Sequence, residues 1–138
     1  MSTYGSVQKI IITGKNNSTV TTIPDGTGVL FDTANPATGD YPPGVVIPTA
    51  SGGVVGTFGV TIEDIPPGKI GKVMVLGAYE MTADGSITAG GYVQVSDTSG
   101  KMGRVKAKGA TVEQLGQALN TVTDGQPCWV YVAKAACA

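Results

Sequence analysis

Apolar and polar positions alternate along most of this chain, in short runs separated by turn residues. The β-branched runs at residues 7–13 and 18–23 flank a polar turn at residues 14–17. This pattern predicts an N-terminal hairpin. A two-stranded hairpin is only marginally stable in water, so its apolar side chains need a covering surface. That surface belongs either to a neighbouring molecule or to the end of the chain's own barrel.

The second half of the chain predicts further strands. Alternation over residues 91–96 and 102–108, around an Asp- and Gly-containing loop, predicts a second hairpin, and residues 128–134 predict a last strand. Residues 111–114 fit the capping box of a helical turn. Residues 115–122 also fit a strand, and both alternatives stay open. The pattern therefore favours strands over helices.

Two segments of the chain align without a gap. Residues 58–68 match residues 115–125 at an offset of 57, which places Gly59 on Gly116 and Gly68 on Gly125. Upstream, Asp32-Thr33 matches Asp97-Thr98 at an offset of 65. Two similar β-units would each leave an apolar face that the other covers.

The predicted fold is therefore all-β, a small β-barrel or two-sheet sandwich built from two similar β-units, with an N-terminal hairpin or arm. The expected domains are an arm at residues 1–26 and a single β-domain at residues 27–138. The internal repeat of that domain covers about residues 27–78 and 90–135.

The composition and net charge exclude several classes of function. Charged residues make up 14% of the 138 residues, the net charge is −1, and there is no His. A chain without a basic excess is not expected to bind nucleic acid. No apolar run approaches the roughly 20 residues of a membrane helix, so we expect no membrane partner. No secretory signal is visible, so we expect Cys128 and Cys137 to be free thiols.

We expect no catalytic residues, no cofactor and no metal. The lack of His removes the commonest general base and most catalytic zinc sites. Most acidic residues lie beside Gly or in clusters of turn residues, where Asp commonly binds its own backbone. Glu63 and Asp64 are sequence neighbours whose side chains point to opposite faces of an extended segment. An enzyme that uses only carboxylates or Cys is the least favoured alternative.

Three groups of residues are candidate interface residues. A basic stripe comprises Lys101, Arg104, Lys106 and Lys108, of which the last three share one face. The stripe is either a solvated strand face that blocks edge pairing or a contact for an acidic surface. Trp129 and Tyr131 share one face of the last strand. Either Trp129 is a core residue, or Trp129 and Tyr131 anchor a subunit interface. The apolar run comprises Val7, Ile10, Ile11 and Ile12.

The C-terminal half resembles the small decoration (cement) proteins of tailed bacteriophage capsids. The matching residues are 90–101, the segment Leu115-Gly116-Gln117-Ala118-Leu119, and Asp124-Gly125 through Val132. The resemblance implies a structural virion protein that binds the outside of an assembled capsid and fastens neighbouring capsomers. It also implies the major capsid protein as partner, a homo-oligomer with a trimer favoured, and synthesis in the host cytoplasm. The alternative is a β-sheet binding module for carbohydrate or peptide.

Overall fold

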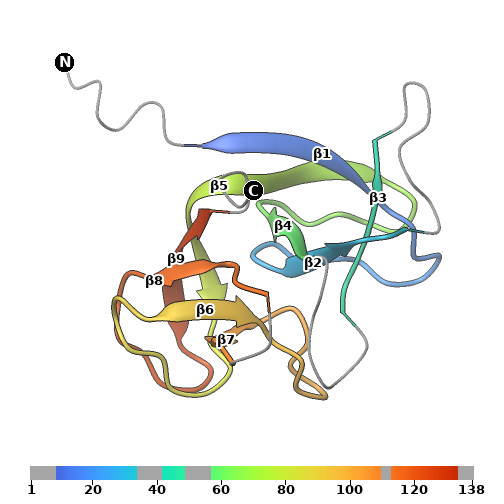
Figure 1. The fold of residues 1–138 in the computed structure, drawn as a ribbon. Helices are drawn as coiled ribbons and strands as arrows, with labels where there is room; N and C mark the ends of the chain where they lie inside the picture. Colours follow the sequence, from blue (N-terminus) through green and yellow to red (C-terminus); the bar gives the residue numbers. More distant parts are fainter. Residues whose placement is uncertain (1–8, 34–41, 49–56, 110–112, 134–138) are drawn as a thin grey trace.

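The computed structural model describes residues 9–33, 42–48, 57–109 and 113–133, and these residues form nine β-strands and no helix (Figure 1). The all-β class predicted from the alternation is confirmed. Strand β8 lies within residues 115–122, where a strand was one of two alternatives; residues 110–112 lie outside the described residues. The strands are β1 (Ile10–Asn16), β2 (Gly28–Phe31), β3 (Gly44–Val46), β4 (Thr57–Thr61), β5 (Ile70–Thr82), β6 (Tyr92–Val95), β7 (Val105–Ala107), β8 (Gly116–Ala118) and β9 (Pro127–Ala133).

Five strands close into a barrel. The order is β1–β3–β2–β4–β5, and β5 pairs back with β1. The β1–β3 contact is parallel and joins Lys15 with Gly44 and Asn16 with Val45, whereas the other contacts of the ring are antiparallel. Ring closure pairs strands that would otherwise present an open sheet edge. The small barrel predicted from the sequence is confirmed.

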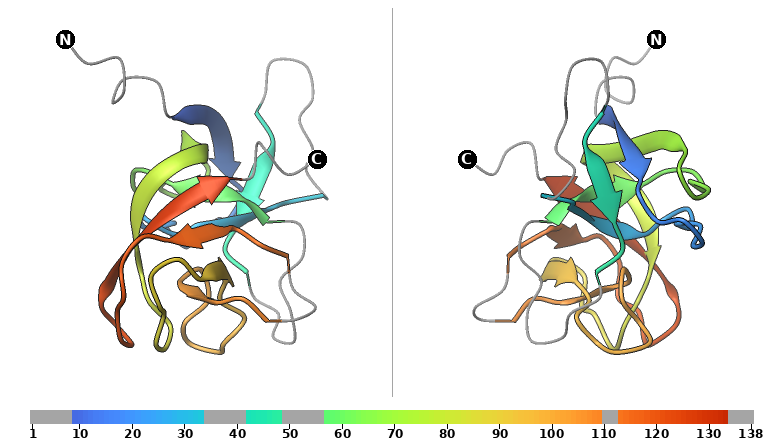
Figure 2. Two further views of the ribbon diagram at one scale, coloured as in Figure 1. Left: turned by 60° about the vertical axis from the view of Figure 1, so that its left-hand side comes forward. Right: turned by 90° about the vertical axis from the view of Figure 1, so that its right-hand side faces the viewer.

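Strand β5 is long enough to serve a second set of strands. Its first half pairs with β1 and β4, and its second half pairs with β9, which continues the sheet through β8, β6 and β7. An isolated parallel bridge between Ala83 and Val105 then brings β7 back to the end of β5. We call β1–β4 with residues 70–76 the N-terminal unit, and residues 77–83 with β6–β9 the C-terminal unit (Figure 2).

The two units repeat one pairing pattern. Val29 pairs with Gly59 in the N-terminal unit, and Val93 pairs with Gly116 in the C-terminal unit. The expected equivalence of Gly59 and Gly116 is therefore present in the pairing. The isolated antiparallel bridge Ile23–Ile65 likewise corresponds to Ile87–Val122.

Hydrogen bonds from backbone amides to side-chain oxygens also recur in both units. The amide of Asp25 donates to Asp64 Oδ1, as the amide of Ala89 donates to Thr121 Oγ1. The offset of 57 holds for β4 and β5 against β8 and β9. The upstream offset is 64 and not the expected 65, because Val29 and Val93 are the buried residues that set the register. The match of Asp32-Thr33 with Asp97-Thr98 therefore gave an upstream offset that is wrong by one residue.

The N-terminal hairpin expected between residues 7–13 and 18–23 is wrong. Residues 10–15 pair instead with β5, which offers a longer partner than the short second run. After β1 the chain forms a turn, in which Ser18 N donates to Asn16 Oδ1 and Thr21 N donates to Ser18 Oγ. Strand β1 is thus part of the closed barrel. The domain limits at residues 26 and 27, and an assembly role for the first residues, stay predictions.

The buried apolar side chains form two clusters. One lies inside the barrel of the N-terminal unit and includes Val29, Ile65 and Val73. The larger cluster fills the C-terminal unit but also includes Val60 and Met74 from the N-terminal unit, both fully buried. An outer face of the N-terminal barrel is therefore packed against the C-terminal unit.

Candidate functional site

Large apolar side chains gather on the outer face of the C-terminal unit. Strand β9 alternates strictly, so that Cys128 and Val130 are buried while Trp129 and Tyr131 are 46% and 38% exposed. Of the two alternatives for Trp129, the core position is wrong, because its strand presents the odd-numbered positions to solvent. An interface role for Trp129 and Tyr131 remains a prediction.

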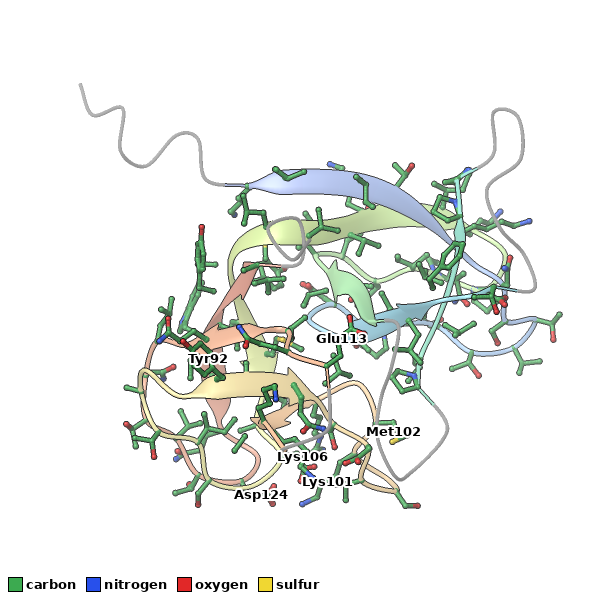
Figure 3. All side chains as sticks on the ribbon, viewed as in Figure 1. Tyr92, Lys101, Met102, Lys106, Glu113 and Asp124 are labelled. Atoms are coloured by element: carbon green, nitrogen blue, oxygen red, sulfur yellow. The ribbon has the colours of Figure 1, made fainter. Side chains whose placement is uncertain are left out.

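Two exposed residues that the sequence analysis did not single out extend this surface. Tyr92 is 58% exposed and pairs with Gln117, which in turn pairs with Tyr131. Leu119 is 52% exposed, and its amide donates to the carbonyl oxygen of Trp129. The alternation of Tyr92 with the apolar Val93 was the signal that could have placed it outside. We call Tyr92, Gln117, Leu119, Trp129 and Tyr131 the aromatic face; Figure 3 labels Tyr92.

The N-terminal apolar run has mixed surroundings. Ile10 and Ile11 are exposed, whereas Ile12 is half-buried against the core of the N-terminal unit. Val7 lies outside the described residues. Along Ile10–Thr13, the described strands pair with β1 only through β5, because β3 begins opposite Lys15. This part of β1 combines exposed isoleucines with a backbone edge that faces no described strand.

The basic stripe is partly neutralised within its own unit. Lys106 Nζ lies 3.1 Å from Asp97 Oδ1, and Lys108 Nζ donates to the carbonyl oxygen of Gly109. Arg104 is half-buried just before β7. The structure thus gives Lys106 an internal partner. A contact of this stripe with an acidic surface stays a prediction.

A second ionic cluster joins three turns at the end of the C-terminal unit, where Figure 3 labels Lys101, Lys106 and Asp124. Lys101 Nζ lies 2.9 Å from Asp124 Oδ1 and 3.6 Å from Asp84 Oδ1. Burial acts to raise the pKa of Asp84, but hydrogen bonds from Ser96 and Thr98 and the nearby lysine charges outweigh it and hold the pKa below 3.8. These ionic contacts hold the three turns together and thereby stabilise the fold.

The carboxylates considered as catalytic candidates bind backbone amides. Glu63 accepts a hydrogen bond from Lys72 N, and Asp64 accepts one from Asp25 N. Burial raises the pKa of the Cys128 thiol, which lies inside the C-terminal unit. Within the described ranges, no group of three or more His, Cys, Asp and Glu residues is placed to hold a metal ion.

A cleft of about 320 Å³ opens beside the N-terminal barrel. Its lining includes Asn17, Asp32, Val46 and Ile47, and Asn17 Nδ2 donates to Asp32 Oδ2 at 3.1 Å. Two of the polar side chains that line the cleft, Asn17 and Asp32, are thus bonded to each other. In the part of the chain that the structure describes, no helix is long and apolar enough to cross a membrane.

The comparison with protein families identifies the class of protein: the chain belongs to the phage cement protein family, whose model matches residues 11–133. It is accordingly a structural protein of phage virions, associated with the capsid. The resemblance seen in the sequence is confirmed, and the matched span includes strands from both units.

A solved structure shares the fold. The N base of the head fiber protein gp8.5 of bacteriophage phi29 matches with a TM-score of 0.59 and 17% sequence identity, covering 91% of this chain and 95% of that chain. At this identity the match shows a common fold. Among curated proteins, no match is significant.

Proposed function

We propose that the protein binds the outside of an assembled phage capsid and stabilises the contacts between neighbouring capsomers. The observation that carries this proposal is membership of the cement family over residues 11–133. The partner would be the major capsid protein. The protein would be made in the host cytoplasm and would join the virion as a homo-oligomer.

The exposed part of β1 is the contact that we propose for the capsid. A strand with an open backbone edge can pair with an extended segment of another protein, while its side chains provide specificity. Ile11 is exposed on this strand and has few charged neighbours along it, since Lys9 and Lys15 lie at its two ends. An apolar capsid segment would cover Ile11 and complete the edge.

Capsid binding can be measured by co-sedimentation with empty capsids assembled from the major capsid protein. We expect the wild-type protein to sediment with the capsids and to raise their melting temperature in scanning calorimetry. Ile11→Glu should weaken binding roughly tenfold or more, because a charge would be buried at the contact. Val20→Glu is the matched control, since Val20 is 84% exposed and lies outside the strands.

The two results have different consequences. A wild-type protein that does not sediment with capsids refutes the proposed function. Binding of Ile11→Glu with wild-type affinity refutes only the assignment to β1. Deleting residues 1–23 is a poorer test, because β1 belongs to the closed barrel and its loss would unfold the N-terminal unit.

A carbohydrate-binding module remains the second candidate, because Trp129 and Tyr131 are exposed on one strand face. Aromatic rings displayed side by side can stack on sugar rings. A glycan screen tests this candidate: binding that is abolished by Trp129→Ala supports it, and a screen without any binding glycan refutes it.

A further inference from the structure

The starting observation is how the two units pack together. Gly28, Val60 and Met74 lie on the outer face of the N-terminal barrel, where all three are buried. Gly28 N donates to the carbonyl oxygen of Gly103, and a β-carbon at position 28 would lie 2.6 Å from the Val95 side chain. Close contact with the C-terminal unit therefore covers this face.

The corresponding face of the C-terminal unit is the aromatic face. The pairs Gly28–Val60 and Val60–Met74 correspond to Tyr92–Gln117 and Gln117–Tyr131. Leu119 corresponds to Ile62 in the same way, because the amide of Ile62 donates to the carbonyl of Lys72 as that of Leu119 donates to Trp129. The positions that are covered in one unit are exposed in the other.

The surface that covers the N-terminal unit also has a counterpart. The C-terminal unit contributes Val95 and Tyr79, whose hydroxyl donates to Asp25 Oδ1 and to the carbonyl oxygen of Ile62. Equivalent pairing places Phe31 at the position of Val95, since Phe31–Val45 corresponds to Val95–Val105.

Ile12 corresponds to Tyr79 by the same reasoning. Ile12 pairs with Val73, and Tyr79 pairs with Val130, which lies 57 positions after Val73. Phe31 and Ile12 are both half-buried and apolar. The N-terminal unit therefore has the counterpart of the surface that receives a neighbouring unit. We call Ile12 and Phe31 the receiving end.

We infer that a second copy of this chain docks head to tail, with the aromatic face of one copy covering the receiving end of the next. The contact inside the chain defines the occupant, because it already joins these two kinds of surface. Side-chain chemistry agrees: a permanent internal contact uses Gly, Val and Met, whereas the exposed counterpart uses Tyr and Gln, which tolerate water before association.

Tyr92 also changes the geometry of the contact. It stands where Gly28 allows close approach inside the chain, so the second copy must lie farther away, with the Tyr92 ring filling the space. A head-to-tail contact joins two different surfaces. It therefore generates a closed ring or a linear chain, and not a two-fold dimer.

Self-association of the full-length protein, without capsids, tests this inference separately from the proposed function. Sedimentation velocity over a concentration series should show association of the wild type. Tyr92→Glu should weaken it roughly tenfold or more, because the substitution places a charge in the contact. Val20→Glu should associate like the wild type, and equal melting temperatures would show that both variants are folded.

Crosslinking identifies the surface that receives the aromatic face. A photoreactive phenylalanine at position 92, in a mixture of isotopically light and heavy chains, should crosslink to peptides that contain Ile12 or Phe31 of another chain. Crosslinks from position 92 to the aromatic face of another chain would overturn the head-to-tail contact in favour of a symmetric one. A wild-type protein that stays monomeric, or a Tyr92→Glu variant that associates normally, would overturn the inference as well.

Discussion

The N-terminal and C-terminal units share strand order and register, yet they differ in what their outer faces meet. Inside the barrels the residues are alike: Val29 and Val45 in one unit correspond to Val93 and Val105 in the other, and all four are fully buried. On the outer faces the residues differ between the units, because one face packs against the other unit and the other face is exposed to solvent. The comparison shows that the inward positions specify the pairing, while the outward positions are free to adapt to an internal neighbour or to solvent.

Polar contacts show the same freedom. Asn17 donates to Asp32 in the N-terminal unit, and at the equivalent place Ser96 donates to Asp84. The hydrogen bond between the two strands is kept, but donor and acceptor have changed sides. In the C-terminal unit the carboxylate of Asp84 also lies 3.6 Å from Lys101 Nζ, which adds an ionic contact.

The largest effect is expected from substitutions that disrupt the strand pairing shared by the two units. A β-carbon at Gly59 would lie 2.5 Å from the carbonyl oxygen of Met74, and one at Gly116 would overlap the carbonyl oxygen of Tyr131. Gly59→Val and Gly116→Val should each destabilise the fold by more than the roughly 1–3 kcal/mol that overpacking usually costs, because the backbone must move. Chemical denaturation monitored by circular dichroism measures this.

Gln117→Val is the matched control for both glycine variants. Gln117 is exposed on β8 beside Gly116, so a β-branched side chain fits there without displacing backbone. A Gly116→Val protein as stable as the Gln117→Val protein would contradict the close approach of β8 and β9.

An intermediate effect sharpens the contrast between the outer faces. Met74 and Tyr131 are equivalent positions, but Met74 is fully buried between the units and Tyr131 is 38% exposed. Met74→Ala should lower the free energy of unfolding by about 2–3 kcal/mol through the cavity it leaves. Tyr131→Ala should cost less than about 1 kcal/mol in the monomer. Equal losses in urea denaturation would show that the two faces are buried alike.

The smallest effect concerns acid stability. The pKa of Asp84 is lowered in the folded protein, so the ionised carboxylate stabilises the fold at pH values above 3.8, the ordinary pKa of this side chain. This contribution is lost as the pH falls below 3.8 and the carboxylate becomes protonated. Asp84→Asn, which copies Asn17 of the other unit, should lower the melting temperature by a few degrees at neutral pH. The difference from wild type should shrink toward acidic pH. Melting curves that stay parallel at every pH would contradict this role.

The sequence predicted the all-β class, the barrel and the internal match around Gly59 and Gly116, because inward alternation and glycines at close approaches leave local signals. It did not predict the partner of β1. Residues 18–23 look as β-branched as a strand, and only the longer β5 decides the competition for pairing. The exposure of Trp129 was equally open, since alternation shows which residues share a face but not which face is inside.

Strand β5 has a mechanical consequence. Its 13 residues have a contour length of about 43 Å and carry hydrogen bonds of the N-terminal barrel at one end and of β9 at the other. A pull between the two units therefore loads one continuous strand in tension and its flanking hydrogen bonds in shear, with no flexible linker to extend first. In the proposed role on a capsid, force between the two units would therefore pass through this strand with little extension.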